Sequence, residues 1–305
     1  MTCWVEAVPN FSEGRRAEVV DELQRVAQSV AGVYLLGRTM DPDHHRAVLT
    51  LAGPRDAMAE AAFLLAESAL RQLDLSQHCG VHPRLGVLDV LPFVPLLGAD
   101  MEDCVQLAGS VGERIGRELE IPVFLYEQAA RQADRRNLAV VRRGGLAGLR
   151  QRMAEQPEWK PDFGPATPHA TAGAVAVGAR FFLVAFNVCL NSRDLGLARS
   201  IARAIRQRDG GLPGVKALGL PLAAQDAVQV SMNLVDYRQT SMLTVYRRIE
   251  RLAKEAGVST RESELIGLAP AAALDAEVAQ QIRLPNFDPM SQVLERRLES
   301  LQQGA

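Results

Sequence analysis

The sequence has few cysteines, no long uninterrupted hydrophobic run and no excess charge of either sign. Its four cysteines are widely scattered and show no C-x-x-C spacing, which argues against a thiol-rich zinc or iron–sulfur site. The most hydrophobic stretch, residues 173–190, is interrupted by Arg180 and Asn187 and is too short to span a bilayer. The N-terminus lacks a basic and hydrophobic leader, so we expect a reducing, cytoplasmic location.

Charge and missing motifs exclude several further classes of protein. The 34 Lys and Arg residues are balanced by 36 Asp and Glu, a formal net charge of −2, so neither nucleic acid nor a membrane surface is expected as a partner. The chain contains no G-x-G-x-x-G after a predicted strand, no G-x-x-x-x-G-K-[ST] and no G-x-S-x-G. These absences argue against NAD binding, ATP hydrolysis by a P-loop and an α/β-hydrolase.

Hydrophobic periodicity predicts the order β-α-β-β-α-β in the first half of the chain. The predicted elements are a strand at 3–9, a helix at 17–30, strands at 33–37 and 47–53, a helix at 54–73 and a strand at 87–94. A helix near 102–119, a strand at 121–126 and a helix before Pro157 follow. With 305 residues, of which 48% are hydrophobic, the chain is long enough for two half-size domains with their own cores.

The second half repeats that order without repeating the sequence. Its predicted elements are a strand at 180–190, a helix capped by Ser192 and continuing through Ile205, strands at 215–220 and 228–235, a helix at 242–256 and a strand at 265–268. The doubled pattern predicts an α+β fold of two ferredoxin-like (split βαβ) subdomains, with the sheets packed against each other and the helices outside. We place the subdomains at 1–178 and 179–305.

Residues 157–172 form a proline-rich segment between the two halves. Four prolines within twelve residues exclude a helix and favour an extended path, the usual composition of an interdomain linker. A simple linker seldom needs Trp159, Phe163 and His169, so the alternative is a binding segment laid across the junction.

The densest group of chemically capable residues is QHCGVHPRLGVLD, residues 77–89. His78 and His82 are four residues apart, but Gly80 and Pro83 argue against a helix, and no third ligand lies at a familiar zinc spacing. A histidine in a loop before a strand suits proton transfer, because its pKa lies near working pH. The structural alternative is a loop histidine bonded to the backbone.

Two further patterns place polar side chains together. The turn DPDHHR, residues 41–46, is either a polar hairpin turn or a site where Asp41 or Asp43 orients an imidazole and Arg46 holds a carboxylate. In the strand 228–235, uncharged hydrogen-bonding residues alternate with hydrophobic ones. This face suits either a polar small molecule or ordinary solvent.

A series of motifs in fixed order resembles glutamate formiminotransferase, the transferase portion of formiminotransferase-cyclodeaminase. They are VEAVPNFSEGRR, DPDHHR with VLTLAG, GVHPRLGVLDVLPFVPL, PVFLYEQAAR, RRGG, KPDFGP, HATAGAVAVGARFFLVAFNVCL and VQVSMNLVDY. The resemblance as a whole runs from about Val5 to Gly267. The chain departs from the usual pattern at Ala170, where H-P-T-A-G has Pro, and at His45, where D-H-N-R has Asn.

The resemblance implies a transferase that moves a formimino group between N-formimino-L-glutamate and tetrahydrofolate, in histidine degradation and one-carbon metabolism. It implies His82 as the catalytic residue. From the chemistry of the transfer we expect His82 to act as general acid and base, Asp41 and His44 to support it, and Arg46 and Arg84 to pair with glutamate carboxylates. The implied folate-binding residues are Phe163, Gly164, Pro165, Ala166, Thr167, Pro168, His169, Ala170, Thr171 and Ala172.

Tetrahydrofolate is then a co-substrate, no metal is expected, and the family suggests a homodimer. The cyclodeaminase domain of the bifunctional enzyme has no counterpart in the sequence, so we expect a separate cyclodeaminase to release ammonia. Three alternatives remain: formyl transfer on the same site, a non-catalytic folate-binding protein, and a structural or partner-binding module.

Overall fold

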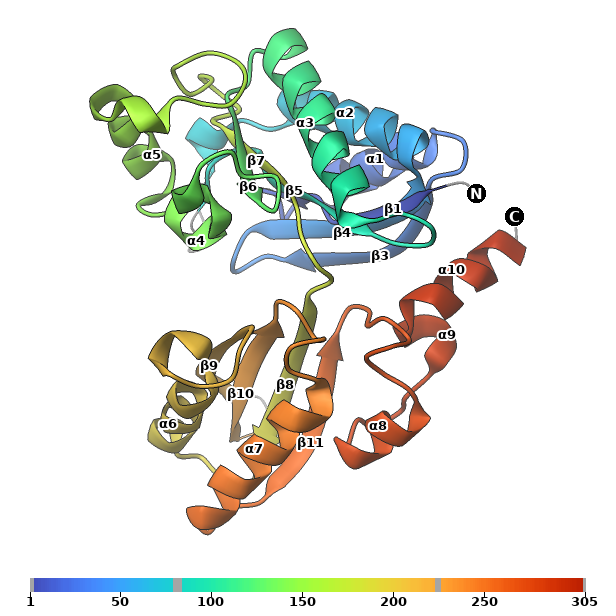
Figure 1. Ribbon diagram of the computed structural model, residues 1–305, viewed down its shortest axis with the longest axis vertical. Helices are drawn as coiled ribbons and strands as arrows, with labels where there is room; N and C mark the ends of the chain where they lie inside the picture. Colours follow the sequence, from blue (N-terminus) through green and yellow to red (C-terminus); the bar gives the residue numbers. More distant parts are fainter. Residues whose placement is uncertain (1–2, 79–83, 223–225, 304–305) are drawn as a thin grey trace. The chain divides into compact units, whose positions relative to one another are not determined.

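The computed structural model describes residues 3–78, 84–222 and 226–303 (Figure 1). The chain folds into two compact units, residues 1–180 and 181–305. The division predicted from the sequence lies between residues 178 and 179. Across the described residues, the helices are all too short or too polar to cross a bilayer.

The first part of unit 1 has the predicted β-α-β-β-α-β order. Its elements are β1 (Trp4–Ala7), the short β2 (Asn10–Phe11), α1 (Ala17–Gln28), β3 (Tyr34–Asp41), β4 (Arg46–Pro54), α2 (Arg55–Gln72), η1 (Leu75–Gln77) and β5 (Leu88–Pro95). Strands β1 and β2 occupy the same position in the sheet, one after the other. Each pairs antiparallel with β4 on one side and with β5 on the other. Because β3 also pairs with β4, the strand order is β3-β4-β1-β5.

The rest of unit 1 extends this sheet beyond β5. It comprises α3 (Met101–Glu118), β6 (Val123–Glu127), η2 (Ala133–Arg136), α4 (Leu138–Val141), α5 (Gly145–Glu155), η3 (Pro157–Trp159) and β7 (Val175–Ala179). Strand β7 lies between β5 and β6 and is parallel to both. The sequence analysis does not predict β7, because residues 173–190 read as one hydrophobic run, which the fold divides into β7 and the next strand, β8, around Arg180.

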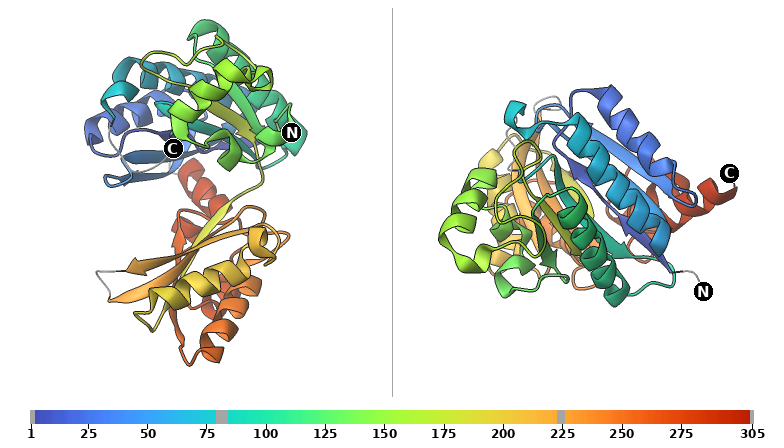
Figure 2. Two further views of the ribbon diagram at one scale, coloured as in Figure 1. Left: turned by 90° about the vertical axis from the view of Figure 1, so that its left-hand side faces the viewer. Right: turned by 90° about the horizontal axis from the view of Figure 1, so that it is seen from above.

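Helices cover one face of the sheet along its whole width, and further helices cover the other face at β6. Helices α1, α2 and α3 lie side by side on one face, and the hydrophobic stripe of α1 that includes Val20 and Leu23 is fully buried there (Figures 1 and 2). On the opposite face, Phe124 and Tyr126 of β6 pack with Trp159 and with residues of α4 and α5. The alternation along β6 therefore supplies two separate hydrophobic clusters.

Unit 2 is a four-stranded antiparallel sheet with helices. Its elements are β8 (Val184–Leu190), α6 (Leu195–Ile205), η4 (Gln207–Asp209), β9 (Val215–Leu222), β10 (Ala227–Leu234), α7 (Met242–Glu255), β11 (Thr260–Ile266), α8 (Ala276–Gln281), α9 (Pro289–Gln292) and α10 (Leu294–Gln303). Its strand order is β11-β8-β10-β9, which matches β5-β1-β4-β3 of unit 1 element for element. Because the two strand orders correspond, we propose a ferredoxin-like architecture for both units. The packing of the two sheets against each other stays a prediction.

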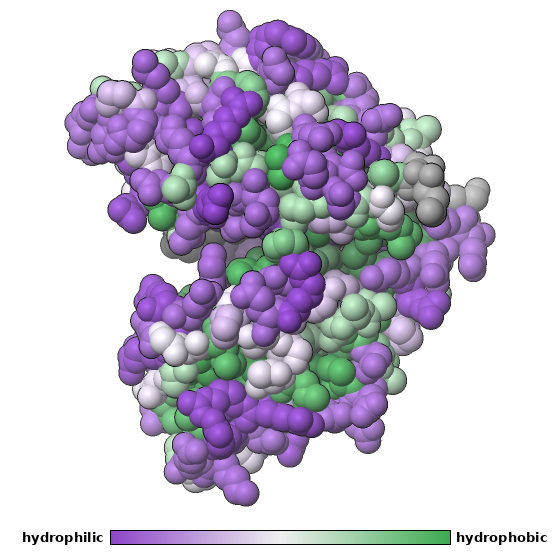
Figure 3. All heavy atoms as spheres, in the orientation of Figure 1, coloured by the Kyte–Doolittle hydropathy of each residue, from purple (hydrophilic) through white to green (hydrophobic). Residues whose placement is uncertain are grey.

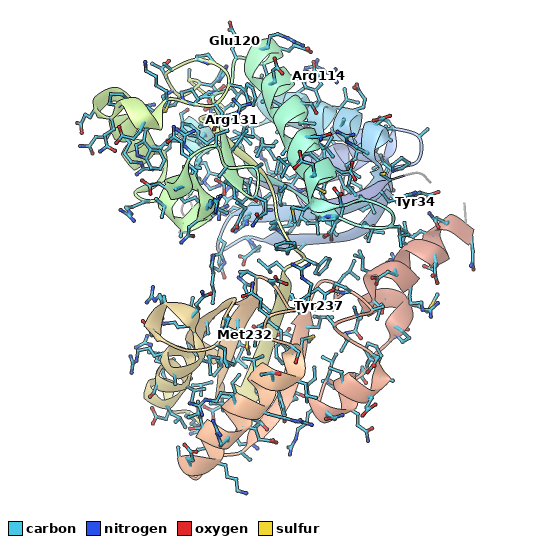
Figure 4. The ribbon with its side chains drawn as sticks, viewed as in Figure 1. Tyr34, Arg114, Glu120, Arg131, Met232 and Tyr237 are labelled. Carbon is cyan, nitrogen blue, oxygen red and sulfur yellow. The ribbon has the colours of Figure 1, made fainter. Side chains whose placement is uncertain are left out.

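Two details of unit 2 bear on the sequence predictions. From Val228 onward, strand β10 alternates as expected: its buried positions include Met232, labelled in Figure 4, while Asn233 is exposed. The predicted helix cap is wrong. Asp194, not Ser192, caps α6, because its carboxylate accepts the Leu197 N–H at 3.1 Å, whereas the Ser192 hydroxyl accepts the Asp194 N–H outside the helix. On the face shown in Figure 3, hydrophilic side chains cover the outer helices of each unit.

A buried guanidinium fixes the start of the proline-rich segment. Arg135 is 1% exposed and donates to the Asp162 carboxylate at 2.7 Å and to the carbonyl oxygens of Glu158 and Lys160 at 2.7 and 2.6 Å. Asp162 also accepts the N–H of Leu125 in β6 at 2.8 Å. The segment is thus held against the sheet by charge-assisted hydrogen bonds, which are stronger than neutral ones.

Replacing Arg135 with Met should destabilise unit 1 by about 3–5 kcal/mol, because the Asp162 carboxylate would stay buried without its partner. Urea unfolding measures the change. The matched control is Arg117→Met, which breaks the ion pair between Arg117 and Glu118. The side chains of these residues are 67% and 39% exposed, so the free energy of unfolding should fall by at most about 1 kcal/mol. Equal losses in the two variants would contradict this account.

Candidate active site

A close approach of two loops shapes the candidate site. A Cβ atom on Gly14 would lie 2.2 Å from the Asp41 carbonyl oxygen and 2.4 Å from the backbone nitrogen of Arg46, so only glycine fits there. Asp41 and Arg46 are opposite each other in the register of the β3–β4 hairpin. His45 lies in the turn of this hairpin and has a positive φ of 51°. The Gly14 N–H donates to His45 Nδ1 at 3.1 Å, which joins the two loops.

A small hollow lies at this end of the sheet, between β2, the hairpin turn, the end of η1 and the residues before β5. It is lined by Phe11, Ser12, His44, His45, Arg46, His78, Arg84 and Asp89. Three of the predicted supports, His44, Arg46 and Arg84, therefore share one hollow. His82 lies outside the described residues; in the sequence it stands between His78 and Arg84.

Asp41 holds the ring of His44. Its carboxylate lies 2.6 Å from His44 Nδ1 and also accepts the N–H groups of Asp43 and His44, each at 2.9 Å. Burial opposes the charged carboxylate, but these hydrogen bonds outweigh it and leave the pKa of Asp41 below its ordinary value. The Asp41–His44 pair is about half exposed, so it lies at the mouth of the hollow.

His45 and His78 form a second pair, deeper in the hollow. Their ring centroids are 4.1 Å apart, and His78 Nε2 lies 3.0 Å from the His45 carbonyl oxygen. The carboxylate of Glu13, 1% exposed, lies 3.6 Å from His45 Nδ1. Burial is the main cause that lowers the pKa of both histidines, and the nearby Arg84 adds to it. Both rings are therefore neutral near pH 7.

Guanidinium groups and a buried carboxylate lie together at the floor of the hollow. Asp89, 3% exposed, accepts the Leu85 N–H at 2.7 Å and a hydrogen bond from Arg142, while Arg46 donates to Asn10. Burial lowers the pKa of Arg46 to about 10, and the charge of Arg142 contributes. Arg142 thus pairs with the buried Asp89 carboxylate, and guanidinium groups in this place suit an anionic ligand group.

Sequence reasoning missed His78, Asp89 and Arg142 as site residues. The only sequence signal for Arg142 is the RRGG motif, which the resemblance includes without a role. His78 and Asp89 lie within the stretch 77–89 that the analysis singled out, but nothing in their spacing shows that His78 meets the hairpin or that Asp89 meets Arg142.

The proline-rich segment is bound at both ends and exposed between them. Phe163 packs against α3 and lies under the guanidinium of Arg131, 4.6 Å from the ring centre (Figure 4). Residues 164–167 are exposed. The segment then closes into a turn in which His169 Nδ1 accepts the N–H groups of Thr171 and Ala172 at 3.3 and 3.1 Å.

Backbone hydrogen bonds tie the end of this segment to the loop that leads into the hollow. The Leu75 N–H donates to the Thr171 carbonyl at 2.8 Å and the Val87 N–H to the Ala172 carbonyl at 3.0 Å. The Ala174 N–H donates in return to the Leu85 carbonyl at 2.9 Å. The structure thus brings the end of the predicted folate segment next to the stretch that contributes His78 and Arg84 to the hollow.

Two other predicted features concern metal and the polar strand. Within residues 3–78, 84–222 and 226–303, there is no group of three or more His, Cys, Asp or Glu side chains placed to hold a metal ion. On unit 2, Asn187 of β8 donates to Glu264 of β11 at 2.9 Å. A ligand-binding role for the polar face of β10 stays a prediction.

The histidine pair makes stability depend on pH. In the folded protein both pKa values lie below the ordinary 6.5. Between 6.5 and the folded values, the unfolded chain binds more protons than the folded one, so the free energy of unfolding falls as pH decreases through that window. In urea unfolding at about pH 7.5 and about pH 5.5, His45→Asn/His78→Gln should lose less stability on acidification than the wild type. An equal loss would contradict the burial of neutral rings.

Comparison with known proteins identifies the family. Residues 4–180 match the N-terminal subdomain of the formiminotransferase domain, and residues 185–283 match the formiminotransferase domain model that follows it. Glutamate formimidoyltransferase of Streptococcus pyogenes is 43% identical over 96% of this chain and 98% of its own length, and that of Thermoplasma acidophilum 42% over 97% of each. Formimidoyltransferase-cyclodeaminase of Sus scrofa is 40% identical over 90% of this chain and 51% of its own length. The chain belongs to the formiminotransferase family.

Proposed function

We propose that this chain is a glutamate formimidoyltransferase, which transfers the formimino group between N-formimino-L-glutamate and tetrahydrofolate in histidine degradation. The observation that carries the proposal is similarity across both units to glutamate formimidoyltransferases, at 42–43% identity over nearly their full length. The backbone bonds between the proline-rich segment and the loop at residues 75–87 support it, since they join a folate segment to a site with acid–base groups.

The chemistry needs one group that both removes and returns a proton. An amine nitrogen attacks the amidine-like carbon of the formimino group, a tetrahedral intermediate forms, and a second amine nitrogen leaves. The attacking amine loses a proton and the leaving amine gains one, and a single imidazole can do both in turn. We assign this role to His82, in the sequence between His78 and Arg84. Asp41 supports the site by holding the ring of His44.

Glutamate supplies the charge that the hollow favours. Arg46 and Arg84 line the hollow, and Asp89 offsets the charge of Arg142 beneath them. A substrate carboxylate placed against Arg46 or Arg84 would meet a guanidinium, which binds a carboxylate through two parallel hydrogen bonds.

Tetrahydrofolate is the co-substrate and carries the one-carbon unit itself. The exposed part of residues 163–172, between the anchored Phe163 and the closed turn at His169, offers small side chains and backbone groups to a flat pterin. We further propose a cytoplasmic homodimer that works with a separate cyclodeaminase. Formyl transfer on the same site is the alternative reaction, and folate binding without catalysis is the alternative role.

Replacing His82 with Gln should lower kcat by about 10²–10⁴ while leaving the affinity for tetrahydrofolate near the wild-type value. The assay mixes protein with N-formimino-L-glutamate and tetrahydrofolate and adds a cyclodeaminase, which converts formiminotetrahydrofolate to its ultraviolet-absorbing methenyl form. His169→Gln is the comparison, since it opens the turn at Thr171 and should raise KM for the folate more than it lowers kcat. A loss confined to KM in the His82 variant would move that residue to a binding role. Folate binding by a wild type that transfers neither formimino nor formyl groups would leave only the binding-protein alternative.

Two glycines of α3 test the folate segment. A Cβ on Gly116 would lie 2.7 Å from the Gly164 nitrogen and 2.8 Å from Phe163 Cβ, so Gly116→Ala must displace the start of the segment. We expect it to weaken tetrahydrofolate binding by roughly tenfold or more, about the effect of a misplaced binding group. Gly109→Ala is the control on the same helix, because nothing lies within 4 Å of its added Cβ. Fluorescence titration with folate measures both, and equal affinities would argue that folate binds elsewhere.

A further inference from the structure

His78 carries a lone pair that the account above leaves unused. Its Nε2 faces the His45 carbonyl oxygen at 3.0 Å, and because a carbonyl only accepts, Nε2 must carry the proton of this neutral ring. Nδ1 is therefore an acceptor. That atom is buried and, within the part of the chain that the structure describes, has no hydrogen-bond partner, although the ring lines the hollow.

The surroundings keep that lone pair free of a proton. The guanidinium of Arg84 donates to the His78 carbonyl at 2.8 Å, so a positive charge stands on the same residue's backbone. The tilted ring of His45 and the buried carboxylate of Glu13 are the other titratable groups near it. Glu13 already accepts the Arg15 and Arg16 N–H groups at 2.9 and 3.0 Å. His78 thus presents a neutral acceptor of fixed tautomer.

A buried acceptor without a donor is costly, and native proteins keep few of them. In a hollow lined by acid–base and guanidinium groups, a bound ligand is the natural source of the missing donor. The two groups that compete for this site differ in that respect: a formimino nitrogen carries a hydrogen, whereas a formyl oxygen has only lone pairs.

We propose that His78 Nδ1 accepts a hydrogen bond from the N–H of the formimino group and thereby selects formimino over formyl donors. The inference rests on the proposed transfer and on its location at this hollow. A formyl oxygen in the same place would bring its lone pairs against the lone pair of His78 Nδ1, and the two acceptors would repel each other. A site built around one hydrogen bond discriminates strongly against an analogue that cannot make that bond. His78 is a specificity-determining residue in this scheme, separate from the proton transfer assigned to His82.

The test compares N-formimino-L-glutamate with N-formyl-L-glutamate, which differ in NH against O. Because an amidine is protonated near pH 7 and an amide is not, the two also differ in charge, so the result is the change in preference between each variant and the wild type. Calorimetry without tetrahydrofolate gives the dissociation constant of each, and the coupled assay gives kcat/KM for formimino transfer. In His78→Gln the longer amide can keep the donor to the His45 carbonyl but leaves no acceptor at the Nδ1 position. We expect the preference for the formimino compound to fall about tenfold or more.

Two further variants sharpen the result. His78→Asn places its amide near the Nδ1 position and can turn either its oxygen or its NH₂ toward the ligand, so it should bind the two compounds with similar affinity. His45→Asn is the matched control: its Nδ1 already receives the Gly14 N–H, so the preference should keep its wild-type value even where both affinities fall.

An unchanged preference in His78→Gln, with formimino transfer by the wild type intact, would overturn this inference alone. Absence of formimino transfer by the wild type would overturn the proposed function and the inference with it. A measurement on the wild type covers the case in which the variants fail to fold. With ¹⁵N-labelled histidine, N-formimino-L-glutamate should move the His78 Nδ1 resonance upfield as it accepts a hydrogen bond, and N-formyl-L-glutamate should not; equal shifts would contradict the proposal.

Discussion

The site depends above all on main-chain hydrogen bonds that join the end of the proline-rich segment to residues 75–87. The carbonyl groups of Thr171 and Ala172 and the N–H of Ala174 make these bonds. Because they use backbone atoms, they hold the two stretches together whatever side chains face the ligand. The same connection joins the proline-rich segment to the hollow within one unit, and it places β7, which directly follows the segment, between β5 and β6.

Buried arginines have two different roles in this unit. Arg135 donates to Asp162 and to two backbone carbonyls, and so serves the framework. At the hollow, Arg142 pairs with Asp89, and Arg46 donates to Asn10. Removing one partner of a buried ion pair costs stability. The guanidinium of Arg135 therefore holds the framework, while the guanidinium groups that line the hollow suit an anionic substrate.

Local patterns predicted most elements because each has a strong periodic signal. The stripe of α1, the alternation of β10 and the repeated β-α-β-β-α-β order follow from spacing alone. Strand β7 escaped because burial on both faces removes the alternation that marks a strand, and it merged with β8 into one hydrophobic run. The cap of α6 was assigned to Ser192 because Ser and Asp are equally good caps, and only the backbone path selects Asp194.

The sequence by itself determined the family, the order of elements and the residues able to do acid–base or carboxylate chemistry, because motifs and periodicity are properties of neighbours along the chain. Only the tertiary structure decided which of them meet. It brings the rings of His45 and His78 within 4.1 Å and pairs Asp89 with Arg142. Among the described residues, it provides no donor for His78 Nδ1. Those relations join residues 33 and 53 positions apart, and such contacts are set by strand register and loop closure, which no local pattern encodes.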